Sequence, residues 1–233
     1  MKTISLFIVI LFFGTIVFSQ TEQTEKVKYT HEFRFNEGIF LNFEQVIEND
    51  PIRKYKILTN ADYHDPVFFD KVLSNEVIYY FNDHSAREEI SLENIWGYSR
   101  NGVLYIRLDE NFIRVTIVGG ICHFVGAVVT MDTRYIDPYQ NPYYNSYNYY
   151  NYYNSYYNPM QPTTYKRTEM KQFILDFETG KVMDYDVRNL QIALMRDPEL
   201  YDEYNSLSSQ KKKQLKFLYI RKFNDRNPIY FTK

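Results

Sequence analysis

Residues 93–130 read ENIWGYSRNGVLYIRLDENFIRVTIVGGICHFVGAVVT, and this stretch decides the fold class. Two runs rich in β-branched and aromatic residues flank Asn101-Gly102, a pair that favours a two-residue type I′ turn because both positions need positive φ. Residues 104–108 alternate between aliphatic side chains and Tyr or Arg, as a strand with two different faces does. A second reversal at residues 109–111 leads into another strand. The stretch therefore predicts an antiparallel meander.

The apolar run at residues 115–130 is the one place where a membrane helix has to be weighed. A helix that spans a bilayer needs roughly 20 apolar residues, whereas this run is shorter, contains His123 and is dense in glycine and β-branched residues. Two core strands with a glycine kink at Gly119-Gly120 explain it better.

The segments before this meander predict more strands and one short helix. We expect a strand, a turn at Glu37-Gly38 and a short strand within residues 29–41, followed by a brief helix that Asn42 caps and Pro51 ends. Residues 52–60 and 76–82 are predicted to be further strands.

The segments after residue 176 change from strand to helix patterns. A turn is predicted at Thr179-Gly180, and Asp186 can cap a helix. Asp197 before Pro198 can cap a second helix, and residues 209–223 predict a last one. The fold class is therefore α+β, an antiparallel β meander followed by two or three C-terminal helices, with a barrel-like sheet left open as an alternative.

The segment between residues 138 and 162 is unusually rich in tyrosine and asparagine. From residue 139 to residue 157 it holds 10 of the 24 tyrosines, in a near period of three that matches neither a helix face nor a strand face. We expect a disordered surface insert. It is either a tolerated expansion or a contact surface whose rings stack on sugars, with candidate contacts at Tyr143, Tyr144, Tyr149, Tyr150, Tyr152 and Tyr153.

The N-terminus has the three parts of a secretory signal peptide: Lys2, an apolar run at residues 4–18, and a small residue at the expected cleavage point, Ser19/Gln20. An uncleaved anchor is the alternative. The single cysteine, Cys122, lies far from this junction, so a lipoprotein signal is not expected. These features predict a periplasmic or secreted protein without a transmembrane segment after cleavage.

The predicted organisation places all mature segments around one domain. It comprises a signal peptide at 1–19, a flexible N-terminus at 20–28, a mainly β domain at 29–137 and 163–185, the disordered insert at 138–162, and a helical segment at 186–233 that packs on the same domain.

Composition and motifs limit the chemistry. A chain that is 45% hydrophobic and 24% charged suits a globular core, and a net charge of -2 does not indicate nucleic acid. The sequence contains no HExxH, P-loop, dinucleotide glycine pattern or G-x-S-x-G elbow, so no cofactor is expected. A loop with Asp62, His64, Asp65 and Asp70 is a weak metal candidate, since turn chemistry explains these residues equally well.

The C-terminal segment is basic. Lys211, Lys212 and Lys213 begin a stretch that could contact anionic lipid or lipopolysaccharide headgroups, and a solvated helix face explains them as well.

Several segments together resemble a group of uncharacterised exported proteins of Bacteroidota-type bacteria. They are EGIFLNFEQVIENDPI (37–52), IWGYSRNGVLYI (95–106), LDFETGKVMDYDVRNLQIALMRDPELYDEYNSL (175–207) and IRKFNDRNPIYF (220–231). The resemblance implies an envelope or secreted setting, and it transfers no catalytic residue because the group has no assigned activity.

Two functions of different classes follow from the sequence. The favoured one is a non-enzymatic cell-envelope protein with a binding or structural role, whose partner is envelope polysaccharide or another envelope protein. The alternative is a hydrolase of polysaccharide or peptide, with two catalytic carboxylates facing each other across a cleft.

Overall fold

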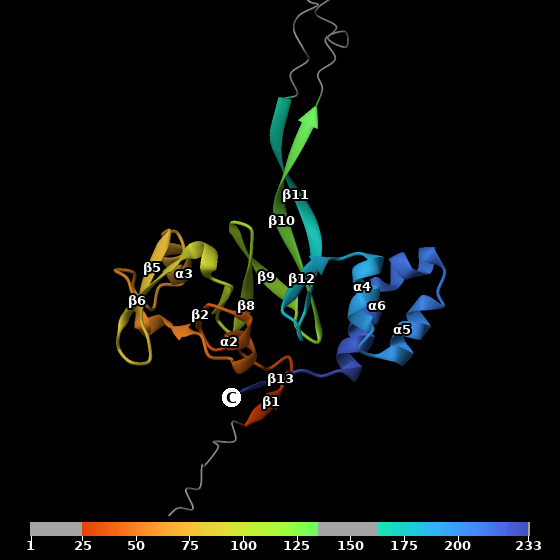
Figure 1. Ribbon diagram of the computed structural model, residues 1–233. Helices are drawn as coiled ribbons and strands as arrows, with labels where there is room; N and C mark the ends of the chain where they lie inside the picture. Colours follow the sequence, from red (N-terminus) through yellow and green to blue (C-terminus); the bar gives the residue numbers. More distant parts are fainter. Residues whose placement is uncertain (1–24, 135–162, 233) are drawn as a thin grey trace, which may run out of the picture.

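The meander forms around the turn that the sequence predicts. A computed structural model describes residues 25–134 and 163–232 (Figure 1). The turn at Asn101 and Gly102, with φ of 53° and 74°, joins β7 (Gly97–Arg100) to β8 (Val103–Leu108). Asp109, with φ of 54°, turns the chain into β9 (Asn111–Ile117), and β10 (Ile121–Arg134) follows.

These strands belong to an open antiparallel sheet in the order β12-β11-β10-β9-β8-β7-β2-β3. The other members are β2 (Gly38–Phe40), β3 (Ile52–Arg53), β11 (Thr163–Asp176) and β12 (Lys181–Asp184). The predicted turn at Thr179-Gly180 joins β11 to β12, with Gly180 at φ 69°. The α+β class with an antiparallel meander is confirmed.

A second, three-stranded sheet interrupts the strand that was expected at residues 52–60. It consists of β4 (Ile57–Leu58), β5 (Val77–Phe81) and β6 (Arg87–Ser91), and α3 (Phe68–Val72) packs with it. β3 pairs with β2 whereas β4 pairs with β5, so the chain crosses between sheets through a 3-10 turn at Lys54–Lys56. One continuous strand could not serve both sheets.

The N-terminal expectations need two corrections. Residues Lys26–Lys28, expected to be flexible, form β1 because they pair with β13 (Tyr230–Thr232) at the other end of the chain. The strand expected before Glu37 is absent. Instead, the rings of Phe33 and Phe35 pack on Phe231, with centroids 4.6 and 5.1 Å from its ring.

The helices begin at the residues that the sequence indicates. They are α2 (Phe43–Glu48), α4 (Val187–Leu194), α5 (Pro198–Asn205) and α6 (Ser209–Arg226). The side chains of Asn42, Asp186 and Asp197 each accept a backbone N–H three residues on, at 2.7–3.1 Å. Each cap thereby pairs one of the N–H groups that a helix start leaves free.

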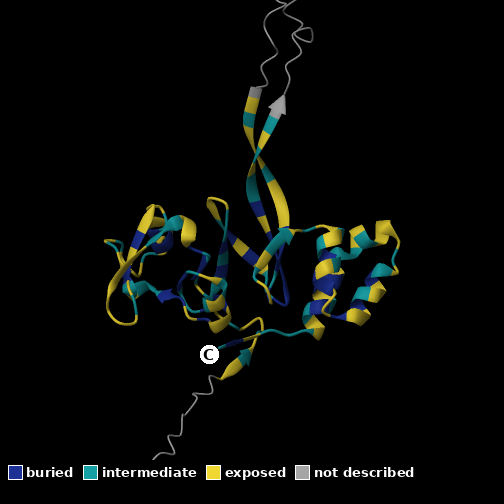
Figure 2. Cartoon of the chain, viewed as in Figure 1, coloured by how far each residue is buried: buried dark blue, intermediate teal, exposed yellow. Residues whose placement is uncertain are grey.

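The base of β10 and β11 separates two hydrophobic cores. Cys122 and Phe124 face a central core with β8, β9 and α2, whereas Ile121 and Ile174 face the core beneath α4, α5 and α6. Residues 121–124 are all buried because alternate side chains point into opposite cores (Figure 2). Gly119 and Gly120, expected as a kink in a run of two core strands, lie in the reversal between β9 and β10.

Candidate functional site: a projecting β-ribbon and a shallow groove

The outer parts of β10 and β11 form a two-stranded ribbon that projects from the body of the protein (Figure 1). Among the described residues, β9 pairs with β10 only at His123 and Phe124, and β12 pairs with β11 only from Phe173 inward. Beyond these points the two strands pair only with each other, from Val125↔Gln172 outward. We call this outer part, residues 125–134 and 163–172, the ribbon.

One face of the ribbon carries an apolar stripe. Val125, Val129 and Met131 alternate along β10, and Met170 lies opposite Ala127 on β11, so all of them share a face. The side chains of Val125, Val129, Met131 and Met170 are 40, 49, 64 and 69% exposed. A contiguous apolar patch that solvent reaches is a common mark of an interaction surface.

The opposite face of the ribbon is packed at its base and polar further out. A Cβ on Gly126 would lie 2.1 Å from Cδ1 of Ile113, so the glycine leaves room for the Ile113 side chain. Further out, Arg167 pairs with Glu169 at 3.4 Å, and the Tyr165 hydroxyl donates to Asp132 at 2.7 Å. The two faces therefore differ in chemistry.

The base of the apolar stripe is closed by the C-terminal helical segment. The ring of His123 contacts the rings of Tyr185 and Phe217, with centroids 4.8 and 5.4 Å apart, and its Nε2 lies 3.1 Å from Oε1 of Gln172. Burial lowers the pKa of His123 below its ordinary value, while Gln172 opposes that shift and Lys216 adds to it. A neutral imidazole therefore anchors the ribbon where the helices stop covering it.

Lys216 reinforces this anchor from α6. Its Nζ donates to the carbonyl oxygen of Tyr185 at 2.6 Å and lies 3.8 Å from the centre of the Tyr185 ring. Burial lowers the pKa of Lys216, with Asp186 opposing the shift. The ribbon thus projects from a fixed platform of strand and helix.

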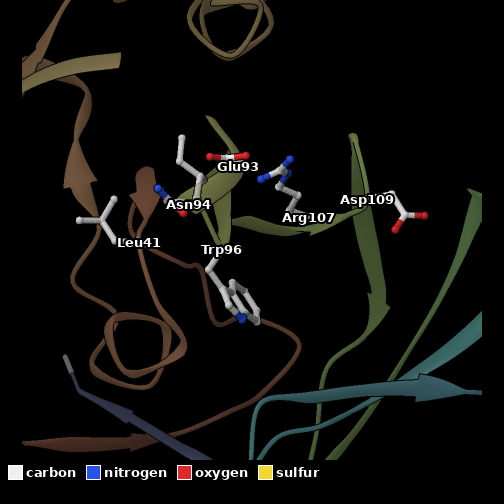
Figure 3. Close-up of a pocket in the computed structure, with 7 residues that line it drawn as sticks. Leu41, Glu93, Asn94, Trp96, Arg107 and Asp109 are labelled. Atoms are coloured by element: carbon white, nitrogen blue, oxygen red, sulfur yellow. The ribbon is translucent and has the colours of Figure 1, made fainter. Parts of the chain in front are cut away.

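A shallow groove of about 520 Å³ lies beside β8, on another part of the molecule (Figure 3). Trp96 forms its floor next to Phe43, and Nη1 of Arg107 donates to the carbonyl oxygen of Leu92 at 2.9 Å. Nε of Arg107 is buried and has no hydrogen-bond partner among the described residues. The remaining lining residues are Leu41, Glu93, Asn94, Ile95 and Asp109.

The two carboxylates of this groove do not face each other. In Figure 3 the Arg107 guanidinium lies between Glu93 and Asp109, and the Asp109 carboxylate points away from it. General acid-base hydrolysis of a glycoside needs two carboxylates that flank one bond. This groove could hold a small polar ligand, but it lacks that arrangement.

The lysines singled out in the sequence lie at the start of α6. Lys211 and Lys213 are exposed and Lys212 is half-buried, and the Lys212 carbonyl accepts the hydroxyl of Tyr204 at 2.8 Å. Cations in the first turn oppose the helix dipole, so helix stability does not account for them. Figure 1 places α6 to one side of the ribbon rather than along it.

The aspartates of the weak metal candidate make hydrogen bonds and ion pairs within the protein. Asp62 accepts the N–H of His64 at 2.9 Å, and Asp65 accepts the N–H of Val67 and pairs with Lys71 at 2.6 Å. Asp70 pairs with Arg100 at 3.2 Å. Within residues 25–134 and 163–232, no group of three or more His, Cys, Asp or Glu residues could hold a metal ion.

The remaining predicted positions lie outside the described residues. They are the cleavage point Ser19/Gln20 and the tyrosines Tyr143, Tyr144, Tyr149, Tyr150, Tyr152 and Tyr153. Sequence reasoning also missed the ribbon itself. The apolar, β-branched run at residues 115–130 predicts core strands and does not distinguish a buried strand from one that projects into solvent.

Across the described part of the chain, no helix is both long enough and apolar enough to cross a membrane. No protein-family model, curated protein or solved structure matches the chain. A function therefore has to be inferred from the geometry of this chain itself.

Proposed function

We propose that this is a non-enzymatic, exported cell-envelope protein that binds a macromolecular partner through the apolar face of its ribbon. The observation that carries the proposal is the exposure of Val125, Val129, Met131 and Met170 on one face of a projecting two-stranded element. Such a face is costly to leave in water, at about 25 cal/mol for each Å² of apolar surface. A partner that covers it removes that cost.

Export is part of the proposal and rests on the N-terminal residues. The apolar run at 4–18 behind Lys2 is typical of a signal peptide, and the resemblance to exported Bacteroidota-type proteins supports the same location. Cell fractionation and N-terminal sequencing test it. An N-terminus at Gln20 in the periplasm or medium is expected, and a cytoplasmic chain that begins at Met1 would contradict it.

The binding role is tested by capture from envelope fractions with a ribbon-face variant. Met131→Glu with Met170→Glu puts two carboxylates on the apolar face at exposed positions, so the fold should persist while the partner is lost. The matched control is Thr164→Glu with Thr168→Glu, which adds two carboxylates at exposed positions on the same face but leaves every apolar residue in place. A partner found in this way must bind again when both proteins are purified.

Equal capture by the wild-type protein and the ribbon-face variant would refute a role for the ribbon. Deleting residues 139–161, or changing Lys211, Lys212 and Lys213 to serine, tests the other two proposed contact surfaces separately. If only the deletion abolishes binding to envelope polysaccharide, the tyrosine-rich insert is the contact surface.

The hydrolase remains the alternative proposal. Glu93 and Asp109 in the groove of Figure 3 are the carboxylates to test first, because they share one concave surface with Trp96. Hydrolysis of polysaccharide or peptide that Glu93→Gln or Asp109→Asn abolishes would favour it over the binding role.

A further inference from the structure

The outward edge of β10 is open for pairing with another strand. β9 leaves β10 after Phe124, so from Val125 outward the only strand described beside β10 is β11, on its other side. An edge strand presents a row of backbone N–H and C=O groups that can pair with another chain.

The two edges of the ribbon differ in charge. The β11 strand carries Lys166, Arg167, Glu169 and Lys171 within the ribbon. Charged side chains, especially lysine, are a common protection of an edge against pairing. The β10 strand has no Asp, Glu, Lys or Arg from Val125 to Met131. Its edge is therefore the unprotected one.

A ribbon of only two strands also has little stability of its own. Isolated two-stranded hairpins are marginally stable in water, and three or more strands with an apolar face are usually needed. The ribbon already has the apolar face, since Met131 and Met170 are 64 and 69% exposed. A further strand beside β10 would supply hydrogen bonds and lateral apolar contacts together.

We propose that the β10 edge pairs antiparallel with the β10 edge of a second copy of this chain, which joins two ribbons into a four-stranded sheet. A two-fold axis at Val129 places Ala127 opposite the second copy's Met131. Odd-numbered residues then oppose odd-numbered residues, so both apolar stripes fall on one face. Asp132 lies opposite Gly126, so no like charges meet.

The second copy is favoured over an unrelated strand because the sequence of β10 complements itself. In this register a large side chain, Met131, faces a small one, Ala127, at two symmetric places, and Val129 faces its own copy on the axis. A closed two-fold contact of this kind uses the same patch on both chains and leaves no further β10 edge to extend the assembly. The contact rests on the proposed function, in which the ribbon is the binding element.

Cysteine crosslinking tests the geometry directly. Residues directly opposite each other in an antiparallel pair have Cα atoms about 4.5–5.5 Å apart, which suits a disulfide. Val129→Cys should therefore crosslink two chains under a mild oxidant. Thr168→Cys is the matched control, because Thr168 pairs with Val129 on β11 and would lie three strand spacings, or about 14 Å, from its copy. Cys122 is fully buried and does not compete.

Light scattering of the purified protein across a range of concentrations tests the assembly. The wild-type protein should be a dimer. Val129→Lys brings two lysines together on the axis and should raise the dissociation constant at least about tenfold, whereas Thr168→Lys should leave it within a few-fold. Val129 is 49% exposed, so the variant should fold, and circular dichroism checks this.

A monomeric wild-type protein at all concentrations, or crosslinking of Thr168→Cys as fast as Val129→Cys, would overturn the proposal. If the wild-type protein is a monomer and the ribbon-face variant still loses an envelope partner, self-pairing is refuted and the proposed function stands. If the protein is a dimer that crosslinks at Val129→Cys, and capture is unaffected by the ribbon-face variant, then self-pairing is supported and the proposed binding role of the apolar face is refuted. A protein that stays monomeric and binds anionic vesicles, with binding lost in Val129→Lys, would show that lipid and not a second copy contacts this part of the ribbon.

Discussion

Replacing Asn224 by alanine should weaken the attachment of helix α6 to the central sheet. The Asn224 side chain accepts the backbone N–H of Ile121 at 2.8 Å and donates to its carbonyl oxygen at 2.9 Å, so one amide serves both groups at the start of β10. The Ile121 residue is fully buried. Leaving a buried backbone group without its partner costs about 1–3 kcal/mol, and two groups are affected, so the free energy of unfolding should fall by roughly 2–6 kcal/mol.

Urea unfolding followed by circular dichroism measures this loss. With a denaturant slope of about 2 kcal/mol/M, the midpoint should fall by roughly 1–3 M at an unchanged slope. Asn224→Asp keeps an acceptor for the Ile121 N–H and loses the donor, so its midpoint should lie between those of the wild-type protein and Asn224→Ala. Asn111→Ala, an exposed position on β9, is the control. A shift below about 0.3 M for Asn224→Ala, or an equal shift for the control, would refute the reasoning.

Three further predictions concern a cap, a buried histidine and a turn. Asp197→Ala removes the α5 cap and one carboxylate partner of Arg226, and a loss of about 1–3 kcal/mol in thermal unfolding is expected; an unchanged melting temperature would contradict it. Burial lowers the pKa of His123, so as pH falls the unfolded chain takes up the proton first, and stability is full above about 6.5 and declines below it. His123→Gln should reduce the dependence of the melting temperature on pH between pH 7 and 5. If the variant and the wild-type protein lose the same number of degrees over this range, His123 is not the cause of the decline. Gly102→Val forces a branched residue to φ 74° and should cost about 1–3 kcal/mol in urea unfolding, whereas Val103→Ala beside it should leave the turn geometry intact.

Local chemistry made much of the fold predictable. The Asn101-Gly102 turn and the caps at Asn42, Asp186 and Asp197 depend on a side chain and a backbone group a few residues apart. Such features can be inferred from adjacent residues because their partners are adjacent. The same holds for the alternation along β8.

The errors arose where the partner lies far along the chain. Phe33 and Phe35 have the spacing of a strand, but they are held by Phe231 at the other end of the chain. Residues 26–28 look like a loose terminus and become a strand through pairing with β13. No local pattern records such a contact.

The candidate site divides in the same way. The sequence by itself determined that residues 121–131 are strand, since their content of β-branched residues and glycine does not suit a helix. Only the tertiary structure decided that residues 121–124 lie between two cores while Val125, Val129 and Met131 face solvent. The physical reason is that an apolar strand residue has the same preference in a core and at an interface, and the elements packed against it decide which of the two it meets.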